Sequence, residues 1–75
     1  MLRSRPIIGF EISYAGKGLF CEAVMRQTSY RIYFDGNFKV EIANAFGQGW
    51  YVTFGTILPA ETIDTIGAHI EGRLD

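Results

Sequence analysis

Residues 50–74 read WYVTFGTILPAETIDTIGAHIEGRL, and they decide the fold because a short aromatic strand passes through Gly55 into a single amphipathic helix. The apolar residues of the second half recur at spacings of three and four: Ile63, Ile66, Ile70 and Leu74. This spacing gathers them on one side of a helix and predicts a C-terminal helix over residues 58–72. Pro59 suits the first helical turn, because the N–H that proline lacks has no partner there. Gly67 falls on the apolar side, where we expect the helix backbone to approach its neighbour closely.

Such a helix needs an apolar surface to cover, and the residues before it have the pattern of strands. The expected strands are residues 8–14, 19–26, 30–34, 38–42 and 50–54. In four of them apolar and polar side chains alternate, which is typical of half-buried strands. Glycines over residues 15–18 and an Asp-Gly pair at Asp35 and Gly36 favour tight hairpins, and short connections predict antiparallel neighbours.

These patterns predict an α+β fold, with an antiparallel five-stranded β-meander and one C-terminal helix packed on one face. A small helix-capped β-barrel is the alternative, since five curved strands can also close. We expect one domain over residues 1–75, with an N-terminal arm at 1–6, the meander at 7–54 and the helix at 58–72.

Alternation also assigns the faces of the predicted sheet. The side chains expected to meet the helix are Ile8, Phe10, Ile12, Ile32, Phe34, Phe38, Val40, Ile42, Trp50, Val52 and Phe54. Those expected on the opposite face are Glu11, Ser13, Arg31, Tyr33, Lys39, Glu41, Tyr51 and Thr53. Residues 19–26 are apolar on both faces, so their inward face stays undecided.

Length and composition narrow the class of protein. A chain of 75 residues buries about 60% of its unfolded surface, so its core is small and self-association would help it. A hydrophobic content of 48% is too high for disorder, yet no apolar run reaches the roughly 18 residues of a membrane span. The first residues lack the apolar core of a signal peptide. We expect a soluble, stand-alone cytoplasmic protein with no membrane partner.

One helix cannot cover both faces of five strands, which leaves apolar surface for a partner. We expect a non-enzymatic protein-interaction or self-associating module. A homodimer is the expected assembly, because two-fold homo-oligomers are the commonest kind, and a different protein partner is also possible.

The alternative function is single-stranded nucleic-acid binding through the exposed sheet face. Arg31, Tyr33, Lys39 and Tyr51 are the candidate binding residues, because bases stack on aromatic rings while cations meet phosphates. The net charge of −1 disfavours this alternative, since phosphate contacts supply most of the affinity of such proteins.

A run of strands followed by Gly-x-x-Leu-Pro-x-Glu and a terminal helix resembles the positive cofactor four family of transcriptional coactivators. The matching residues are Gly55, Leu58, Pro59 and Glu61. Members of that family are dimers that grip single-stranded DNA with their sheets, so the resemblance implies a dimeric nucleic-acid binder. The chain departs from the family in its sheet, which has few lysines.

Catalytic and metal chemistry have little support in the sequence. His69 is the only histidine and falls at the border of the apolar stripe, where a partly buried ring is expected. Cys21, the only cysteine, is expected to be a small buried apolar residue. One cysteine and one histidine fall short of a structural zinc set. We therefore expect no catalytic residues, no metal and no cofactor.

Overall fold

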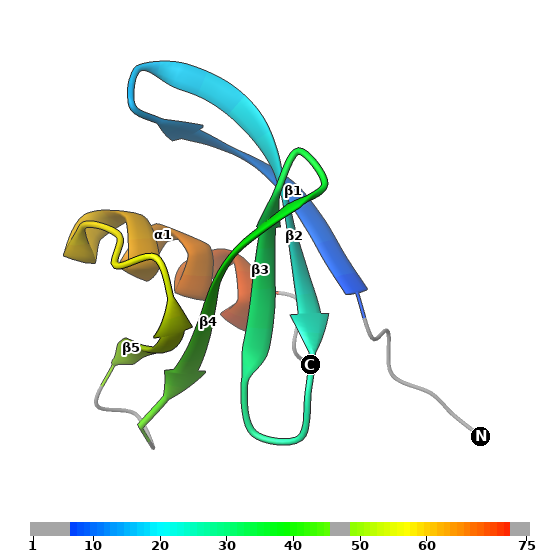
Figure 1. Cartoon of the computed structure of the whole chain (residues 1–75), viewed down its shortest axis with the longest axis vertical. Helices are drawn as coiled ribbons and strands as arrows, with labels where there is room; N and C mark the ends of the chain where they lie inside the picture. The colour runs from blue at the N-terminus through cyan, green and yellow to red at the C-terminus, as the bar shows by residue number, and fades with distance from the viewer. Residues whose placement is uncertain (1–6, 46–48, 73–75) are drawn as a thin grey trace.

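The computed structural model describes residues 7–45 and 49–72, which form one antiparallel sheet and one helix (Figure 1). The elements are β1 (Ile7–Tyr14), β2 (Lys17–Met25), β3 (Tyr30–Phe34), β4 (Asn37–Asn44), β5 (Trp50–Gly55) and α1 (Ala60–Glu71). Each strand pairs antiparallel with the next one in the chain, so the sheet order is β1-β2-β3-β4-β5. The predicted five-stranded meander with a C-terminal helix is confirmed.

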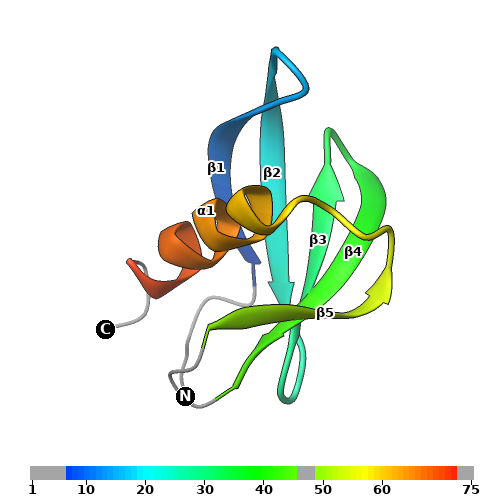
Figure 2. The same cartoon turned by 90° about the vertical axis from the view of Figure 1, so that its left-hand side faces the viewer.

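The sheet is curled but open. Among the described strands, β1 and β5 stand at opposite ends of the sheet and do not pair with each other. Helix α1 packs against both of them and crosses one face of the sheet (Figure 2). The barrel alternative is therefore wrong, because the helix lies against the two strands that a closed barrel would join.

Two-residue turns connect β1 to β2 and β3 to β4. Ala15 and Gly16 have φ angles of 54° and 78°, and Asp35 and Gly36 have φ angles of 50° and 87°. Positive φ at both central residues is the requirement of the type I′ turn, whose twist matches that of the flanking strands. The Asp-Gly hairpin is confirmed, whereas the turn predicted over residues 15–18 is shorter because β2 already begins at Lys17.

Helix α1 begins one residue after Pro59, whose carbonyl accepts hydrogen bonds from the N–H groups of Thr62 at 3.0 Å and Ile63 at 3.1 Å. The predicted start at residue 58 is two residues early. Leu58 precedes a proline, and steric contact with the proline ring disfavours the helical conformation there. Leu58 instead contributes a buried side chain to the core.

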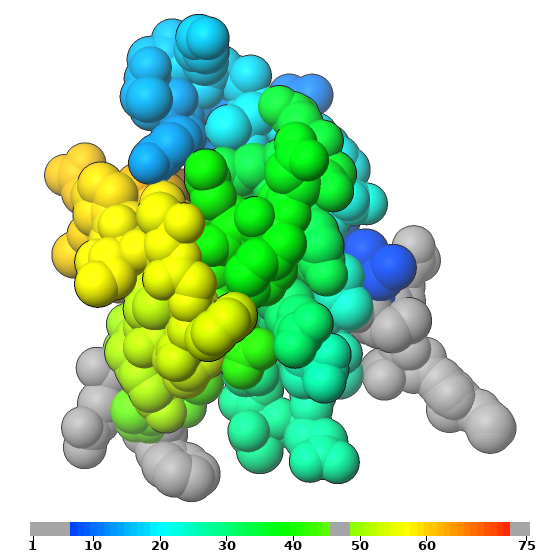
Figure 3. Space-filling view, in the orientation of Figure 1, coloured from blue at the N-terminus to red at the C-terminus, as the bar shows by residue number. Residues whose placement is uncertain are grey.

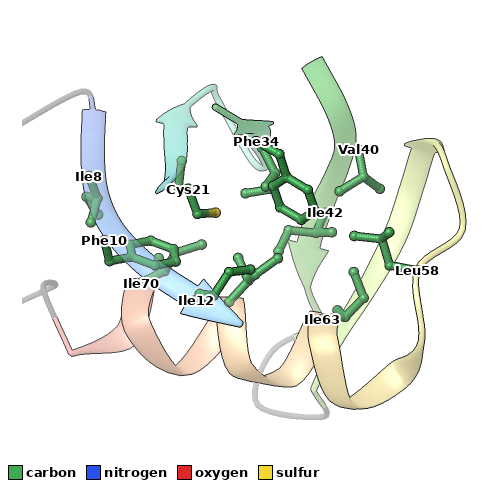
Figure 4. Close-up of a cluster of buried hydrophobic side chains, with 13 residues drawn as sticks. Ile8, Phe10, Ile12, Cys21, Phe34, Val40, Ile42, Leu58, Ile63 and Ile70 are labelled. Carbon is green, nitrogen blue, oxygen red and sulfur yellow. The ribbon is translucent and has the colours of Figure 1, made fainter. Parts of the chain in front are cut away.

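The core lies between α1 and the face of the sheet that it covers (Figure 4). Its buried side chains are Ile8, Phe10, Ile12, Cys21, Ala23, Ile32, Phe34, Val40, Ile42, Leu58, Ile63, Ile66 and Ile70. The predicted apolar stripe of the helix is thus confirmed, and each buried isoleucine contributes about 1.5–3 kcal/mol. Leu74 and the arm at residues 1–6 lie outside the described residues.

The inward face of β2, undecided from the sequence, carries Cys21 and Ala23. Both are fully buried, and Leu19 packs against the same core. Phe20 lies on the opposite side and is 43% exposed. Cross-strand neighbours decide between two apolar faces here, because Cys21 and Ala23 pair with the buried residues Phe34 and Ile32 of β3.

A β-bulge reverses the alternation near the start of β4. Ile32 pairs with Val40. The next residue, Tyr33, pairs with Phe38, so Lys39 is the extra residue of the bulge. Phe38 consequently leaves the helix-covered face and is 39% exposed. The prediction that Phe38 faces the helix is wrong because the bulge shifts the period by one residue.

A second bulge has the same effect in β5. Ile42 pairs with Val52, but Glu41 pairs with Phe54, so Thr53 is the extra residue. Phe54 is 65% exposed, and the prediction that it faces the helix is also wrong. Trp50 and Val52, before the bulge, pack against the core as expected.

Gly67 lies where the helix packs closely against the Trp50 ring of β5. A β-carbon built on Gly67 would lie 2.2 Å from Cδ1 of Trp50, well inside van der Waals contact. The indole Nε1 of Trp50 also donates a hydrogen bond of 3.0 Å to Oε2 of Glu71. The absent side chain at Gly67 therefore lets β5 dock against the helix, as the sequence predicts.

We expect Gly67→Ala to lower the free energy of unfolding by about 1–3 kcal/mol, because the added methyl group must displace the Trp50 ring. Gly72→Ala is the matched control. Gly72 has a helical φ of −69°, and the nearest atom to its β-carbon would be the Ala68 carbonyl oxygen at 3.4 Å. Urea unfolding of both variants measures the difference, and equal stabilities would contradict the close packing.

Candidate docking surface

The face of the sheet turned away from α1, here called the outer face, carries a row of aromatic rings. Tyr33 and Phe38 meet edge to face with ring centroids 5.7 Å apart, and Phe38 and Phe54 are tilted with centroids 6.1 Å apart. We call Tyr33, Phe38 and Phe54 the aromatic patch. In Figure 3 the atoms of β3 and β4, in green, lie beside those of β5 and the segment after it, in yellow-green to yellow. The three strands that carry the patch thus share one continuous surface.

The aromatic patch exists because of the two bulges. Strict alternation along β4 and β5 would turn Phe38 and Phe54 towards the helix. Sequence reasoning therefore found Tyr33 but missed the other two rings. The only sequence signal for Phe54 is Gly55 directly after it, since glycine inside a strand pattern often marks irregular pairing.

A charged residue already lies on this aromatic surface. The guanidinium carbon of Arg31 is 5.9 Å from the ring centroid of Phe38, within the range of a cation–π interaction. Nε of Arg31 also donates to Oε1 of Glu41 at 3.3 Å. Arg31 therefore lies between an aromatic ring and a carboxylate.

Glu41 collects further donors from the neighbouring strands. Its Oε2 accepts hydrogen bonds from the hydroxyl groups of Ser29 at 3.0 Å and Thr53 at 3.2 Å. The Ser29 hydrogen bond is the main cause that holds the pKa of Glu41 below its usual value, and Thr53 and Arg31 act in the same direction. This network ties together β4, β5 and the turn before β3.

The four binding residues expected from the sequence do not all come together. Arg31 and Tyr33 lie in or beside the aromatic patch. Tyr51 is half exposed on β5. Lys39, in contrast, has its Nζ 5.8 Å from the ring centroid of Phe34, a core residue. The expectation that Lys39 shares the outer face is wrong, because the bulge at Lys39 turns its side chain towards the covered face.

The other candidates for chemistry are involved in packing. The Cys21 thiol is fully buried, and burial raises its pKa to about 12, so the thiol holds its proton at neutral pH. The His69 ring stacks on Phe10 with centroids 4.4 Å apart, in the half-buried position that the sequence predicts. Within residues 7–45 and 49–72, no three His, Cys, Asp or Glu side chains are grouped closely enough to hold a metal ion. None of the described helices has both the length and the apolarity to cross a bilayer.

We expect Ser29→Ala to raise the pKa of Glu41 towards the ordinary glutamate value of about 4.3, because it removes the strongest donor to the carboxylate. The pKa of Glu41 is lower in the folded than in the unfolded protein, so ionised Glu41 stabilises the fold at pH values above the unfolded-state pKa. This stabilisation is lost as the pH falls through the folded-state pKa. NMR titration of the Glu41 side-chain carboxyl measures the change. Thr65→Ala is the control, since that hydroxyl donates to the Glu61 carbonyl on the helix. An unchanged pKa in Ser29→Ala would refute the role of Ser29.

Comparison of the chain with models of known protein families, with curated proteins and with solved structures gives no match. The resemblance to the positive cofactor four family therefore rests on Gly55, Leu58, Pro59 and Glu61 alone.

Proposed function

We propose that this chain is a non-enzymatic protein-interaction module that docks its partners through the outer face, with the aromatic patch at the centre. The exposure of Phe54 and Phe38, turned outward by two bulges, is the observation that carries the proposal. Bulges re-aim side chains at functional edges and sites. Exposed aromatic rings are also the side chains that most often dominate binding energy at protein interfaces.

The dimensions of the surface agree with a docking role. A fully buried aromatic side chain covers about 150–250 Å², so the exposed parts of Phe38, Phe54 and Tyr51 supply about 300 Å² of ring surface. A standard interface covers about 800 Å² on each partner. The aromatic rings would thus form the core of such an interface, and the polar residues around them its rim.

A second copy of the chain is one partner that we propose for this surface, as a homodimer. Glu11 and Glu22 alternate onto the outer face, since their neighbours Phe10, Ile12, Cys21 and Ala23 face the core. Two outer faces in contact would bring carboxylates of the same sign together, which weakens association at low ionic strength. We therefore expect a weak dimer that added salt strengthens.

Phe54→Ser should shift this dimer towards monomer by about tenfold in dissociation constant, because loss of a central aromatic contact typically costs more than 1 kcal/mol. Light scattering or sedimentation across a micromolar concentration series measures it. Ile57→Ser is the control, since Ile57 is 84% exposed in the segment between β5 and α1 and has no ring to add to the patch. An equal effect of both substitutions would indicate non-specific apolar contact instead.

Single-stranded nucleic acid is the second candidate, and the exposed rings of the aromatic patch favour it, because bases stack on exposed aromatic side chains. If the chain binds single-stranded nucleic acid, a labelled oligonucleotide should bind more tightly at low salt than at moderate salt. Tyr33→Ser should then weaken this binding about tenfold. Phe20→Leu, outside the patch, is the comparison. Absence of any salt-dependent binding would end this candidate.

A further inference from the structure

The outer face carries more negative than positive charge. The charged side chains that the five strands place there are Glu11, Glu22, Arg31 and Glu41. Arg31 and Glu41 pair with each other. Within the described part of the chain, Glu11 and Glu22 form no ion pair. Two carboxylates without an ion-pair partner among the described residues therefore lie on the outer face of β1 and β2.

An aromatic ring lies between these two carboxylates. Phe20 pairs with Glu11, and its ring extends over Gly9, where a β-carbon would come within 2.6 Å of the Phe20 Cζ. Gly9 in turn pairs with Glu22, which places the ring between the positions of Glu11 and Glu22. Phe20 is 43% exposed, so the residue keeps surface that a ligand could contact.

Asp35 adds a third carboxylate beside Phe20. Its Oδ1 accepts a hydrogen bond of 3.0 Å from the Phe20 N–H, and its own N–H donates to the Phe20 carbonyl at 2.8 Å. Glu11, Phe20 and Asp35 line the same shallow hollow at this end of the sheet. The hollow thus combines an apolar ring with negative charge.

The same sheet contains an arginine side chain that contacts both an aromatic ring and a carboxylate. Arg31 lies over the Phe38 ring and beside Glu41, so ring, guanidinium and carboxylate are satisfied together. Phe20 with Glu11 and Glu22 repeats the ring and the carboxylates on the neighbouring strands. A guanidinium is weakly hydrated and planar, and it can stack on a ring while its N–H groups meet carboxylates.

We propose that the outer face binds an arginine-bearing segment of a protein partner. Its guanidinium lies on Phe20 between Glu11 and Glu22, and its apolar side chains cover the aromatic patch. This inference rests on the proposed docking function and specifies the chemistry of the partner. Charge complementarity selects this occupant, because a second copy or a nucleic acid would bring further negative charge to the same face.

A synthetic eight-residue peptide of alternating arginine and leucine is the probe, and the same peptide with citrulline for arginine is its neutral match. Calorimetric titration into the full chain should show binding of the arginine peptide that weakens as salt is added. Glu11→Gln with Glu22→Gln should weaken it about fivefold. Glu61→Gln with Asp64→Asn removes two charges from the exposed side of the helix and should leave the affinity unchanged.

The outcomes separate this inference from the proposed function. The proposal of an arginine-bearing partner is refuted if the arginine peptide does not bind at millimolar concentration. It is also refuted if the citrulline peptide binds equally well. If Phe54→Ser abolishes binding while the double glutamine variant binds normally, the docking function stands and the cationic partner falls. If neither variant changes the affinity, both fall. Salt-strengthened self-association with no peptide binding assigns the face to a second copy and also overturns the inference.

Discussion

The packing of α1 against β1 and β5 is the contact on which the rest of the fold depends, because it holds the two ends of an open, curled sheet. Ile66 and Ile70 are fully buried, and Gly67 lets the helix axis come down onto the Trp50 ring. A single helix of twelve residues can cover only one face of the sheet. The opposite face is therefore left to solvent or to a partner by the architecture itself.

The bulges at Lys39 and Thr53 expose Phe38 and Phe54 to solvent in a chain whose apolar core is small. Burying a phenylalanine contributes about 1.5–3 kcal/mol, and a chain of this length has a small core. Strict alternation would give Phe38 an inward position, yet Lys39 turns its ammonium group to the covered side instead. The docking surface that we propose would give a reason for this arrangement.

Hydrophobic periodicity and turn residues predicted the parts of the fold that depend on interactions between residues close in sequence. The helical stripe with Gly67, the Asp-Gly hairpin and the order of the strands follow from periodicity and turn chemistry, and the structure confirms them. The start of the helix was missed by two residues, although Pro59 contains the information. The inward face of β2 could not be predicted, because it depends on which residues of β3 lie opposite.

The candidate site was predicted only in part for the same reason. Arg31 and Tyr33 lie on β3, which has no extra residue and keeps its alternation, so the sequence places them correctly. The two bulges change the faces of Phe38, Phe54 and Lys39. Each bulge arises from pairing between two strands, and no single residue type in the sequence predicts where a bulge forms. The missed residues are thus the ones that give the outer face its aromatic character and remove its second cation.

The Glu41 network connects the strands of the outer face beside the aromatic patch. Ser29, Thr53 and Arg31 reach Glu41 from three different segments, so their hydrogen bonds fix β3, β4 and β5 relative to one another beside the exposed rings. A surface whose side chains are already ordered loses less conformational entropy when a partner binds. The bulges turn the rings outward, and the polar network beside them holds the same strands in register. The two features together order the side chains of the face that we propose for docking.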